Sequence, residues 1–479
     1  MKDLLKTTSA IGLTEVLLMF VALARNKYLA VTIGPEGFGI YGLLSAFFMM
    51  IAVFASTWMA AGTIKYTSEY YAKGDKESLN SIFSFSTIIA TSISIFLTII
   101  LIVWRKWFII TFLSDEINEV YYLIFCAAFL AICLRPIFLG VLQGLRRIKE
   151  VVISRWSIAI FNLIFTIILV WVWDLTGFFI SLLVNAIFAI IILYWGIKRK
   201  GGLQLKKISW QDPIVRLLLV FGGVNLCLAI MNLSSQYFQR NIILHNMDIG
   251  TVGLFQAGVA LMGYMGIINR GSSFYFFPKM AEKLDSTSRN KMINDYLRFI
   301  LLFSIPISVL AILFGKWAII LLYSSEFIPL VSVFFLFVIG QLIGSIGGVF
   351  QSTVVGMAKL KMHSASSIVI HFLWVIIPFF LINKYGIGAL GLAFIFGSFS
   401  GGILNWLYLR NKIKLRFNNN VILLFLISVP LLTGAILLSN SMIMWRILLA
   451  VISAGLMVKM IRYEEWMIAC NYISIKFKR

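Results

Sequence analysis

The sequence predicts an all-α, polytopic membrane protein of about fourteen transmembrane helices, with two six-helix lobes related by a pseudo-two-fold axis and two further C-terminal helices. Three observations predict this fold class. The 479 residues are 61% hydrophobic and only 13% charged, with a mean hydropathy of +0.96, which leaves too little polar surface to cover a soluble chain. The hydrophobic residues form runs of about 20, the length that crosses a bilayer. The first half of the chain is also echoed in the second.

Four pairs of similar segments occur in the same order in the two halves. GPEGFGIYGLL at 34–44 resembles DIGTVGLFQAG at 248–258, which places Gly39 on Gly253, 214 positions later. Such a long period is typical of a duplicated transporter, not of a solenoid repeat. Each repeat has an even number of helices, so we expect the halves to be parallel, related by an axis along the membrane normal. The other pairs are the segments around Lys65 and Lys279, KWFIITFLSDE with KWAIILLYSSE, and QGLRRIK with VGMAKLK.

The helix positions follow from the apolar runs in chain order. The first run continues without a cleavage site of small residues, so it is a retained spanning helix rather than a signal peptide. The later runs are separated by short polar or basic segments. The predicted helices are 4–31, 38–62, 80–103, 119–143, 153–173, 177–197, 214–241, 252–277, 295–314, 328–355, 365–382, 388–409, 421–439 and 443–461.

These helices fall into consecutive parts of the chain. The basic segment KRKGGLQLKKISWQDP ends in proline and separates the two halves, so we expect a cytoplasmic linker that lies on lipid headgroups. We also expect a short helix at KWFIITFL, which follows the third apolar run. This helix would be half-embedded in the membrane. The predicted parts are an N-lobe at 1–200, the linker at 201–213, a C-lobe at 214–411, two extra helices at 412–462 and a cytoplasmic tail at 463–479.

The formal charge of +22 comes from lysines and arginines that cluster in alternate short loops. This is the positive-inside distribution, and it predicts an inner (cytoplasmic) membrane protein with both termini in the cytoplasm. It also argues against a nucleic-acid partner, since no solvated basic face is formed. The three histidines are scattered and no catalytic motif is present. We therefore expect no enzymatic activity, no cofactor and no metal site.

Charged residues inside the apolar runs are the candidate functional groups. A charge at the bilayer centre costs about 2.5–3.5 kcal/mol, so such residues normally face a partner or a water-filled cavity. Guanidinium groups bind phosphate bidentately and stay charged when desolvated. The excess of arginine predicts a cavity that binds an anion, and a diphosphate group fits it. The candidate diphosphate-binding residues are Arg25, Arg135, Arg240 and Arg270, with Glu15 as a coupling-ion site or charge partner.

A structural alternative remains open for these charges. Glu15 could pair with one arginine, and the arginines near helix ends could reach the headgroups. A polar face also runs along the helix predicted at 214–241 and onto the next one. Amide side chains on such a face can hold neighbouring helices together or contact a sugar. The candidate glycan-contact residues are Asn225, Asn232, Gln236 and Gln256.

The run LAVTIGPEGFGIYGLLSAF, followed by GTIKYTSEYY and later by QGLRRIK, resembles the O-antigen and related polysaccharide flippases of the MOP superfamily, which also contains MATE drug exporters and lipid II flippases. The resemblance implies a MATE-like pair of six-helix bundles around a central cavity. It also implies that a polyprenyl-diphosphate-linked oligosaccharide, such as a repeat unit for lipopolysaccharide, moves from the cytoplasmic to the outer leaflet by alternating access. A polysaccharide polymerase would be a further partner, and H⁺ or Na⁺ a coupling ion.

Two other functions stay open at the level of sequence. The extra pair of helices resembles the fourteen-helix lipid II flippases, which would change the attached glycan and keep the diphosphate carrier. A MATE-type cation or drug antiporter is less compatible with a cavity that holds one acid and four bases. A membrane glycan polymerase or ligase would be expected to have a large outer loop, which this sequence lacks.

Overall fold

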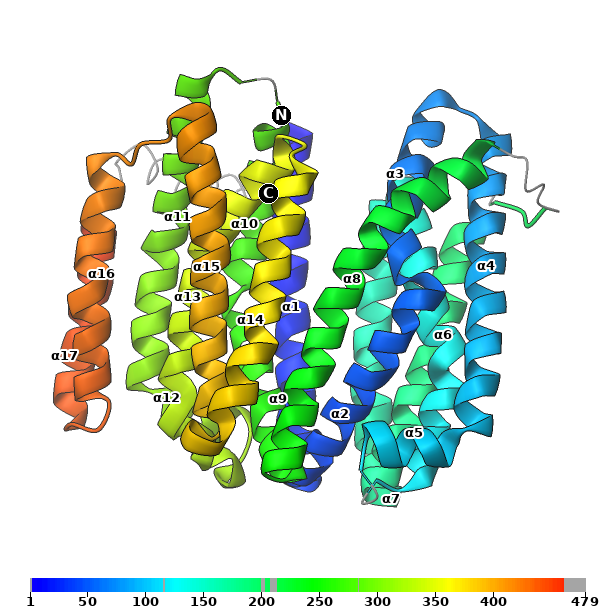
Figure 1. Cartoon of the computed structure of the whole chain (residues 1–479), viewed down its shortest axis with the longest axis horizontal. Helices are drawn as coiled ribbons and strands as arrows, with labels where there is room; N and C mark the ends of the chain where they lie inside the picture. The colour runs from blue at the N-terminus through cyan, green and yellow to red at the C-terminus, as the bar shows by residue number, and fades with distance from the viewer. Residues whose placement is uncertain (1, 115–116, 200–202, 207–212, 283, 461–479) are drawn as a thin grey trace, which may run out of the picture. The chain divides into compact units, whose positions relative to one another are not determined.

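The computed structural model describes residues 2–114, 117–199, 203–206, 213–282 and 284–460, and its regular secondary structure there is helical (Figure 1). Within these residues, ten helices are long and apolar enough to cross a membrane, or eleven if one bent pair counts as a single span. The predicted all-α, polytopic class is therefore confirmed. The chain forms two compact units, the first of Met1–Ala257 with Leu322–Glu326 and the second of Gly258–Leu321 with Phe327–Arg479.

The first unit holds the N-terminal helices and the start of α9, which continues beyond it. Several helices are longer than predicted because polar turns extend them past the apolar run. The elements are α1 (Lys2–Thr32), α2 (Gly34–Ala52), the π-helical turn η1 (Val53–Thr57), α3 (Trp58–Lys73), α4 (Lys76–Val103), α5 (Arg105–Phe112), α6 (Glu119–Gly144), α7 (Ile148–Lys198), α8 (Pro213–Asn246) and α9 (Ile249–Met265).

The helices α2, η1 and α3 form one continuous apolar stretch, where the sequence predicts a helix at 38–62. It begins at Gly34–Pro35, with proline in the first turn, where its missing N–H costs no hydrogen bond. It ends at Gly74, whose φ of 71° places it in the left-handed region that closes helices. The polar residues TSEYYAK add turns that hydropathy alone does not predict.

The 51-residue α7 is a hairpin of two antiparallel helices, as the separate predictions at 153–173 and 177–197 require. The backbone leaves helical geometry at Trp173 and Asp174. Thr166 lies before this break and Ser181 after it, and their hydroxyl oxygens are 3.3 Å apart across the hairpin. A Cβ on Gly177 would lie 1.8 Å from the carbonyl oxygen of Leu169, so this turn requires glycine.

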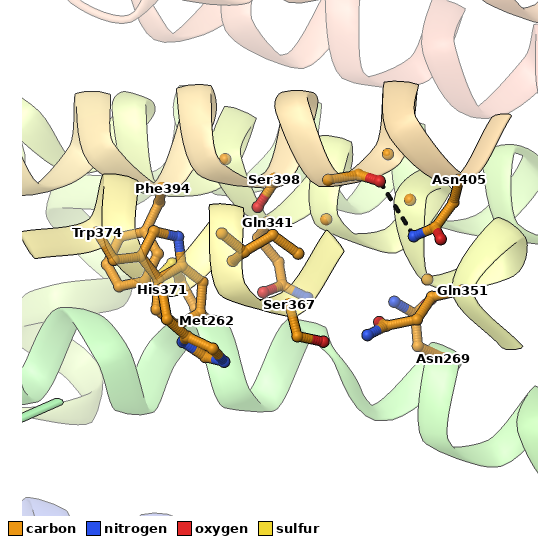
Figure 2. Close-up of a pocket in the computed structure, with 17 residues that line it drawn as sticks. Met262, Asn269, Gln341, Gln351, Ser367, His371, Trp374, Phe394, Ser398 and Asn405 are labelled. Atoms are coloured by element: carbon orange, nitrogen blue, oxygen red, sulfur yellow. Dashed lines mark hydrogen bonds between the residues drawn. The ribbon is translucent and has the colours of Figure 1, made fainter. Parts of the chain in front are cut away.

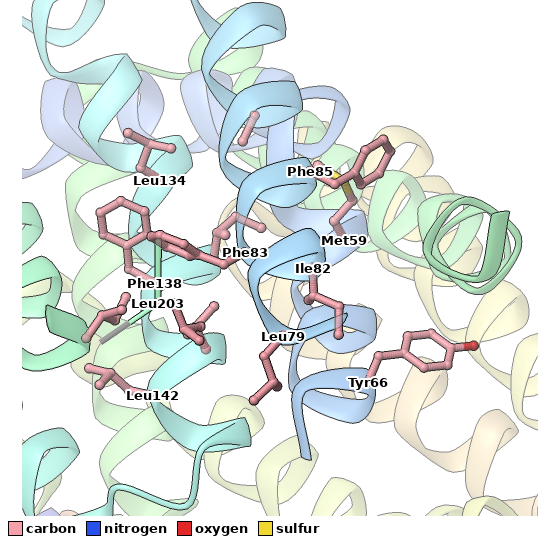
Figure 3. Packing of buried hydrophobic residues seen from close by; sticks show 14 of the residues in the cluster. Met59, Tyr66, Leu79, Ile82, Phe83, Phe85, Leu134, Phe138, Leu142 and Leu203 are labelled. Atoms are coloured by element: carbon pink, nitrogen blue, oxygen red, sulfur yellow. The ribbon is translucent and has the colours of Figure 1, made fainter. Parts of the chain in front are cut away.

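An apolar cluster forms the core of the first unit (Figure 3). Ile82 and Phe83 of α4 are fully buried in it, among side chains from α3, α6, α7 and α8. Leu203, from the described part of the linker, is also buried there. Inside a bilayer such side chains stabilise the fold through close van der Waals packing against one another. This core fixes the positions of α6, α7 and α8, which carry Arg135, Arg155 and Arg240.

The second unit holds the rest of α9 and the remaining helices, except Leu322–Glu326, which belongs to the first unit. In it, α15 packs between α13 and α14, while the C-terminal pair α16 and α17 lies against α11 (Figure 1). Arg298 of α11 donates to the carbonyl oxygen of Met460 at 2.6 Å, which ties the end of α17 to α11. The elements are α10 (Ile267–Ala281), α11 (Ser286–Leu313), α12 (Gly315–Leu322), η2 (Ser325–Leu330), α13 (Val331–Gly356), α14 (Leu360–Tyr385), α15 (Gly388–Ile413), α16 (Asn419–Leu438) and α17 (Ile443–Lys459).

The duplication is visible in local structure. The repeated KW segments form the short helices α5 and α12, which begin 210 positions apart at Arg105 and Gly315. Asp75 caps α4 through the backbone N–H of Ser78 at 3.0 Å. Asp285, again 210 positions later, caps α11 through Ser288 at 3.2 Å. The first N–H groups of a helix have no partner within the helix, and such side-chain acceptors satisfy them.

The segment after each repeat docks in the same way. The backbone N–H of Gln204 donates to the Asn80 side chain at 2.8 Å. In the second repeat, the N–H of Arg416 donates to Asn290 at 3.1 Å. A further pair of hydrogen bonds follows this pattern. The backbone N–H of Lys206 donates to the Ser84 hydroxyl, and that of Asn418 donates to the Asn294 side chain, both at 2.8 Å. The repeat therefore extends past its last helix into an extended segment that returns to the start of α4 or α11.

Candidate functional site

The first unit gathers several arginines from separate helices, and Arg240 of α8 is the most buried, at 5% exposure. Its Nε and Nη2 donate to the side-chain oxygen of Gln256 on α9, at 3.2 and 2.5 Å. Its Nη1 donates to the backbone oxygen of Gln236 at 2.6 Å. The guanidinium carbon also lies 5.4 Å from the ring centre of Phe255. Neutral oxygens thus satisfy this cation without cancelling its charge.

Tyr41 of α2 links Arg240 to a second arginine. The Tyr41 phenol lies within electrostatic range of both Arg240 and Arg135, which is on α6. The two helices that carry Tyr41 and Arg240, α2 and α8, pack side by side (Figure 1). Tyr41 therefore marks the place where three helices bring their polar side chains together.

Arg25 of α1 contacts an aromatic ring that Tyr41 also contacts. Its guanidinium lies 5.4 Å from the ring centre of Phe178, and Tyr41 packs edge-on against the same ring at 5.2 Å. The Nε of Arg25 donates to the hydroxyl of Thr166 at 3.1 Å. Both Phe178 and Thr166 come from the α7 hairpin, so the break in α7 is what presents them to α1.

Arg135 interacts electrostatically with a further cation, Arg155 of α7. The Arg135 side chain is exposed and Arg155 is half-buried. Like charges at this range repel each other, and a bound anion would relieve the repulsion. Among the described residues, no acidic side chain forms an ion pair with Arg135 or Arg240. We call Arg25, Arg135, Arg155 and Arg240, together with Tyr41, the arginine cluster.

The other predicted charges are placed differently. Arg270 belongs to the second unit, where it is exposed and donates to the carbonyl oxygen of Gly263 at 2.7 Å. Glu15 is in α1, but its side chain lies outside the described part of the structure. The predicted tail at 463–479 lies outside it too.

The predicted glycan-contact residues divide into two groups. Asn232, Gln236 and Gln256 belong to the hydrogen-bonded network of Arg240, because Gln236 also donates to the Asn232 side chain at 2.9 Å. Asn225 donates instead to the backbone of Phe221 in its own helix, at 2.9 Å. The spacing of four residues along α8 was the signal that found Asn232, Gln236 and Arg240 on one face.

Sequence reasoning missed Tyr41, Arg155 and Phe178. Arg155 follows a basic loop, where it resembles the cytoplasmic cations that set orientation. Tyr41 and Phe178 stand in apolar runs rich in aromatic residues, where belt and core positions look alike. A signal was available for Arg155 alone, since it falls within the predicted helix 153–173.

A sequence model of the polysaccharide biosynthesis protein family matches residues 4–261. No curated protein sequence matches the chain. The match covers more than half of the 479 residues, and it includes every member of the arginine cluster.

Solved structures of transporters share the fold at low sequence identity. An inward-facing multidrug-resistance MATE transporter of the MOP superfamily has a TM-score of 0.74 at 13% identity, over 83% of this chain and 94% of that one. The lipid II flippase MurJ in an inward closed conformation has 0.73 at 16%, over 93% and 97%. A MOP superfamily transporter from Pyrococcus furiosus Vc1, described as having a binding pocket of reverse polarity, has 0.64 at 15%, over 86% and 96%.

Proposed function

This chain belongs to the polysaccharide biosynthesis protein family and has the fold of MOP superfamily transporters, and on that premise we propose that it is a flippase for a polyprenyl-diphosphate-linked oligosaccharide. Its substrate would be a repeat unit of O-antigen or exopolysaccharide, moved from the cytoplasmic to the outer leaflet. The family is one of transporters rather than enzymes, so the protein moves the lipid-linked glycan without altering a covalent bond.

The arginine cluster is the observation that carries this proposal. Arg135 and Arg240 lie within electrostatic range of Tyr41, Arg155 lies within that range of Arg135, and Arg25 contacts the Phe178 ring on which Tyr41 packs. Two of them, Arg135 and Arg240, have no carboxylate partner among the described residues. A diphosphate offers oxygens in the spacing that bidentate guanidinium groups recognise. Its charge would also offset the cost of holding cations at membrane depth.

The role of each residue follows from its present contacts. Arg135 and Arg155 would bind the diphosphate directly, since a shared anion relieves their repulsion. Arg240 is held by Gln256 and Gln236, so it would act as a fixed positive charge beside the ligand. Arg270 in the second unit remains a candidate diphosphate-binding residue. Glu15 remains the candidate site for H⁺ or Na⁺ coupling, and a polysaccharide polymerase a candidate partner.

The proposal includes a topology of fourteen spans with both termini in the cytoplasm. Eleven candidate spans are supported by length and composition. The remaining three would be α1, α17 and the second half of the α7 hairpin, which is counted once with the first half. Lysines and arginines in alternate loops support the orientation. Transport would proceed by alternating access of the two duplicated halves.

A lipid II flippase is the second candidate, because the fold match to the lipid II flippase MurJ extends over 93% of this chain. It requires the same diphosphate chemistry with a different glycan. A MATE-type antiporter for cationic drugs is less favoured, because the arginine cluster would repel a cation.

Deletion of the gene in its native host tests the proposal. The surface polysaccharide should disappear while lipid-linked oligosaccharide accumulates on the cytoplasmic side, and the gene on a plasmid should restore export. Complementation of a strain depleted of its own lipid II flippase would instead favour the second candidate. Unchanged surface polysaccharide in the deletion strain, with no accumulated precursor, would exclude the flippase.

A further inference from the structure

The second unit contains a cavity of about 290 Å³ that is distinct in chemistry from the arginine cluster (Figure 2). Its volume is near the lower end of the range for small-molecule sites, which is about 300–1,000 Å³. None of its lining residues is Asp, Glu, Lys or Arg. The lining instead combines four side-chain amides, two serines, a histidine, two aromatic rings and six glycines, with Met262 and Ile370 completing the wall.

One end of the cavity carries amide groups from three helices. Figure 2 shows Asn405 of α15, Gln351 of α13 and Asn269 of α10 at this end. Asn405 is 1% exposed, and its Nδ2 donates to the carbonyl oxygen of Gly401 at 3.0 Å. The Oδ1 atoms of Asn405 and Asn269 are buried and have no hydrogen-bond partner among the residues that the structure describes. Buried acceptors of this kind need a donor, because leaving them empty costs about 1–3 kcal/mol each.

The other end of the cavity is aromatic. Trp374 packs edge-on against His371 at 5.1 Å and against Phe394 at 4.9 Å. Gly397 makes room for the indole, since a Cβ there would lie 2.5 Å from the Trp374 ring. Figure 2 shows Trp374, Phe394 and His371 together at this end, away from the amides. The indole is therefore held by its neighbours as part of the cavity wall.

Glycines of α13 and α15 open the space between the two ends. A Cβ on Gly348 would meet no atom within 4 Å, so the cavity reaches the backbone of α13 at that point. Gly347 and Gly402 bring α13 and α15 close together, with a Cβ on either lying 3.4 Å from the other's Cα. The cavity thus exists because these positions lack side chains.

We propose that this cavity binds one neutral sugar residue of the transported glycan, an inference that rests on the proposed flippase function. A sugar ring has hydroxyl donors for the oxygens of Asn405 and Asn269 and C–H faces that pack on the indole of Trp374. A calcium or magnesium ion would require carboxylates, and a phosphate would require Lys or Arg side chains, and the lining has neither. A lipid chain would leave the amides unpaired.

The test is saturation-transfer NMR on the full-length protein in lipid nanodiscs. The probes are D-glucose, D-galactose, L-rhamnose and N-acetyl-D-glucosamine, with inorganic pyrophosphate measured separately by calorimetry. At least one sugar should receive saturation from the wild-type protein. Gly348→Leu should weaken its binding about tenfold or more by filling the cavity, and Asn405→Leu should do so by removing a hydrogen bond. Pyrophosphate binding should be unchanged in both variants.

Gly455→Leu is the matched control, because Gly455 of α17 is exposed and a Cβ there also meets no atom within 4 Å. It should bind the sugar as the wild type does. The assignment is overturned if no sugar receives saturation, or if Gly348→Leu binds as strongly as the Gly455→Leu control. Sugar binding and export are scored separately. If the protein exports polysaccharide but its cavity binds no sugar, the sugar-site proposal is wrong. If the deletion strain still makes normal surface polysaccharide, the flippase proposal is wrong.

Discussion

Gly39 of α2 and Gly253 of α9 pack reciprocally through their backbones. A Cβ on Gly39 would lie 1.9 Å from the carbonyl oxygen of Ile249, and a Cβ on Gly253 would lie 1.8 Å from that of Pro35. Pro35 and Ile249 are separated by the same 214 positions as the two glycines. Each copy of the repeated segment therefore contacts its counterpart at the equivalent atom, as a local two-fold relation requires.

Gly39→Ala and Gly253→Ala should each destabilise the protein. The added methyl group cannot fit against a backbone carbonyl, so α2 and α9 must separate, at a cost of about 1–3 kcal/mol for an overpacked contact. Thermal unfolding in detergent, followed by loss of the monodisperse peak on size exclusion, measures this. Gly223→Ala, at an exposed position of α8, is the control, since its Cβ meets nothing within 4 Å. Equal stability of all three variants would contradict the packing described.

Removal of single arginines from the cluster should reduce export without unfolding the protein. We expect Arg135→Ala and Arg155→Ala each to lower the export rate about ten- to a hundredfold, the loss expected for one charged hydrogen bond. Surface polysaccharide per cell, normalised to the membrane level of the protein, is the measurement. Lys73→Ala removes a cation that is exposed and paired with Glu69, and it should export normally. Normal export by both arginine variants would separate the cluster from transport.

Gln256→Glu should neutralise Arg240 while preserving its geometry. The new carboxylate would stand where the amide oxygen now accepts from Nη2 and Nε, and it would form an internal ion pair. We therefore expect weaker pyrophosphate binding with unchanged or higher thermal stability. Gln256→Leu should do the opposite, because Arg240 then loses its acceptor in a buried position, at about 1–3 kcal/mol. Gln204→Glu, at an exposed position of the linker, is the control for added charge.

The helix caps Asp75 and Asp285 should make stability depend on acid pH. The hydrogen bonds that Ser78 donates hold the pKa of Asp75 below its ordinary value, and those of Ser288 do the same for Asp285. Carboxylates whose folded pKa is depressed stabilise the fold above the unfolded pKa, which is about 4, and lose that contribution as the pH falls through the folded pKa. Thermal stability should therefore fall as the pH drops below about 4.

The double variant Asp75→Asn, Asp285→Asn separates this effect from other acid groups. Asparagine caps a helix about as well as aspartate but does not titrate in this range. The variant should lose less stability than the wild type between pH 5 and pH 3. An identical decline in both proteins would assign the acid sensitivity to other carboxylates.

The sequence was sufficient where a signal repeats along the chain. The predicted helix 119–143 agrees with α6 to one residue at its end, and the paired predictions 153–173 and 177–197 match the two arms of α7. The repeated KW segments do form equivalent short helices. By contrast, α11 begins at Ser286, nine residues before the predicted start at 295, because its first turns are polar and a hydropathy run does not include them.

What the sequence by itself determined is the membrane environment, the helix order and the duplication, since bilayer thickness and hydrophobicity act on each segment separately. The tertiary structure alone decided that Arg25 and Tyr41 share the ring of Phe178, that Arg155 lies within electrostatic range of Arg135, and that Asn405 and Trp374 line one cavity. These relationships depend on how each helix is rotated about its axis and which neighbour it packs on. Small residues and buried contacts set both, and neither has a period that can be read along one chain.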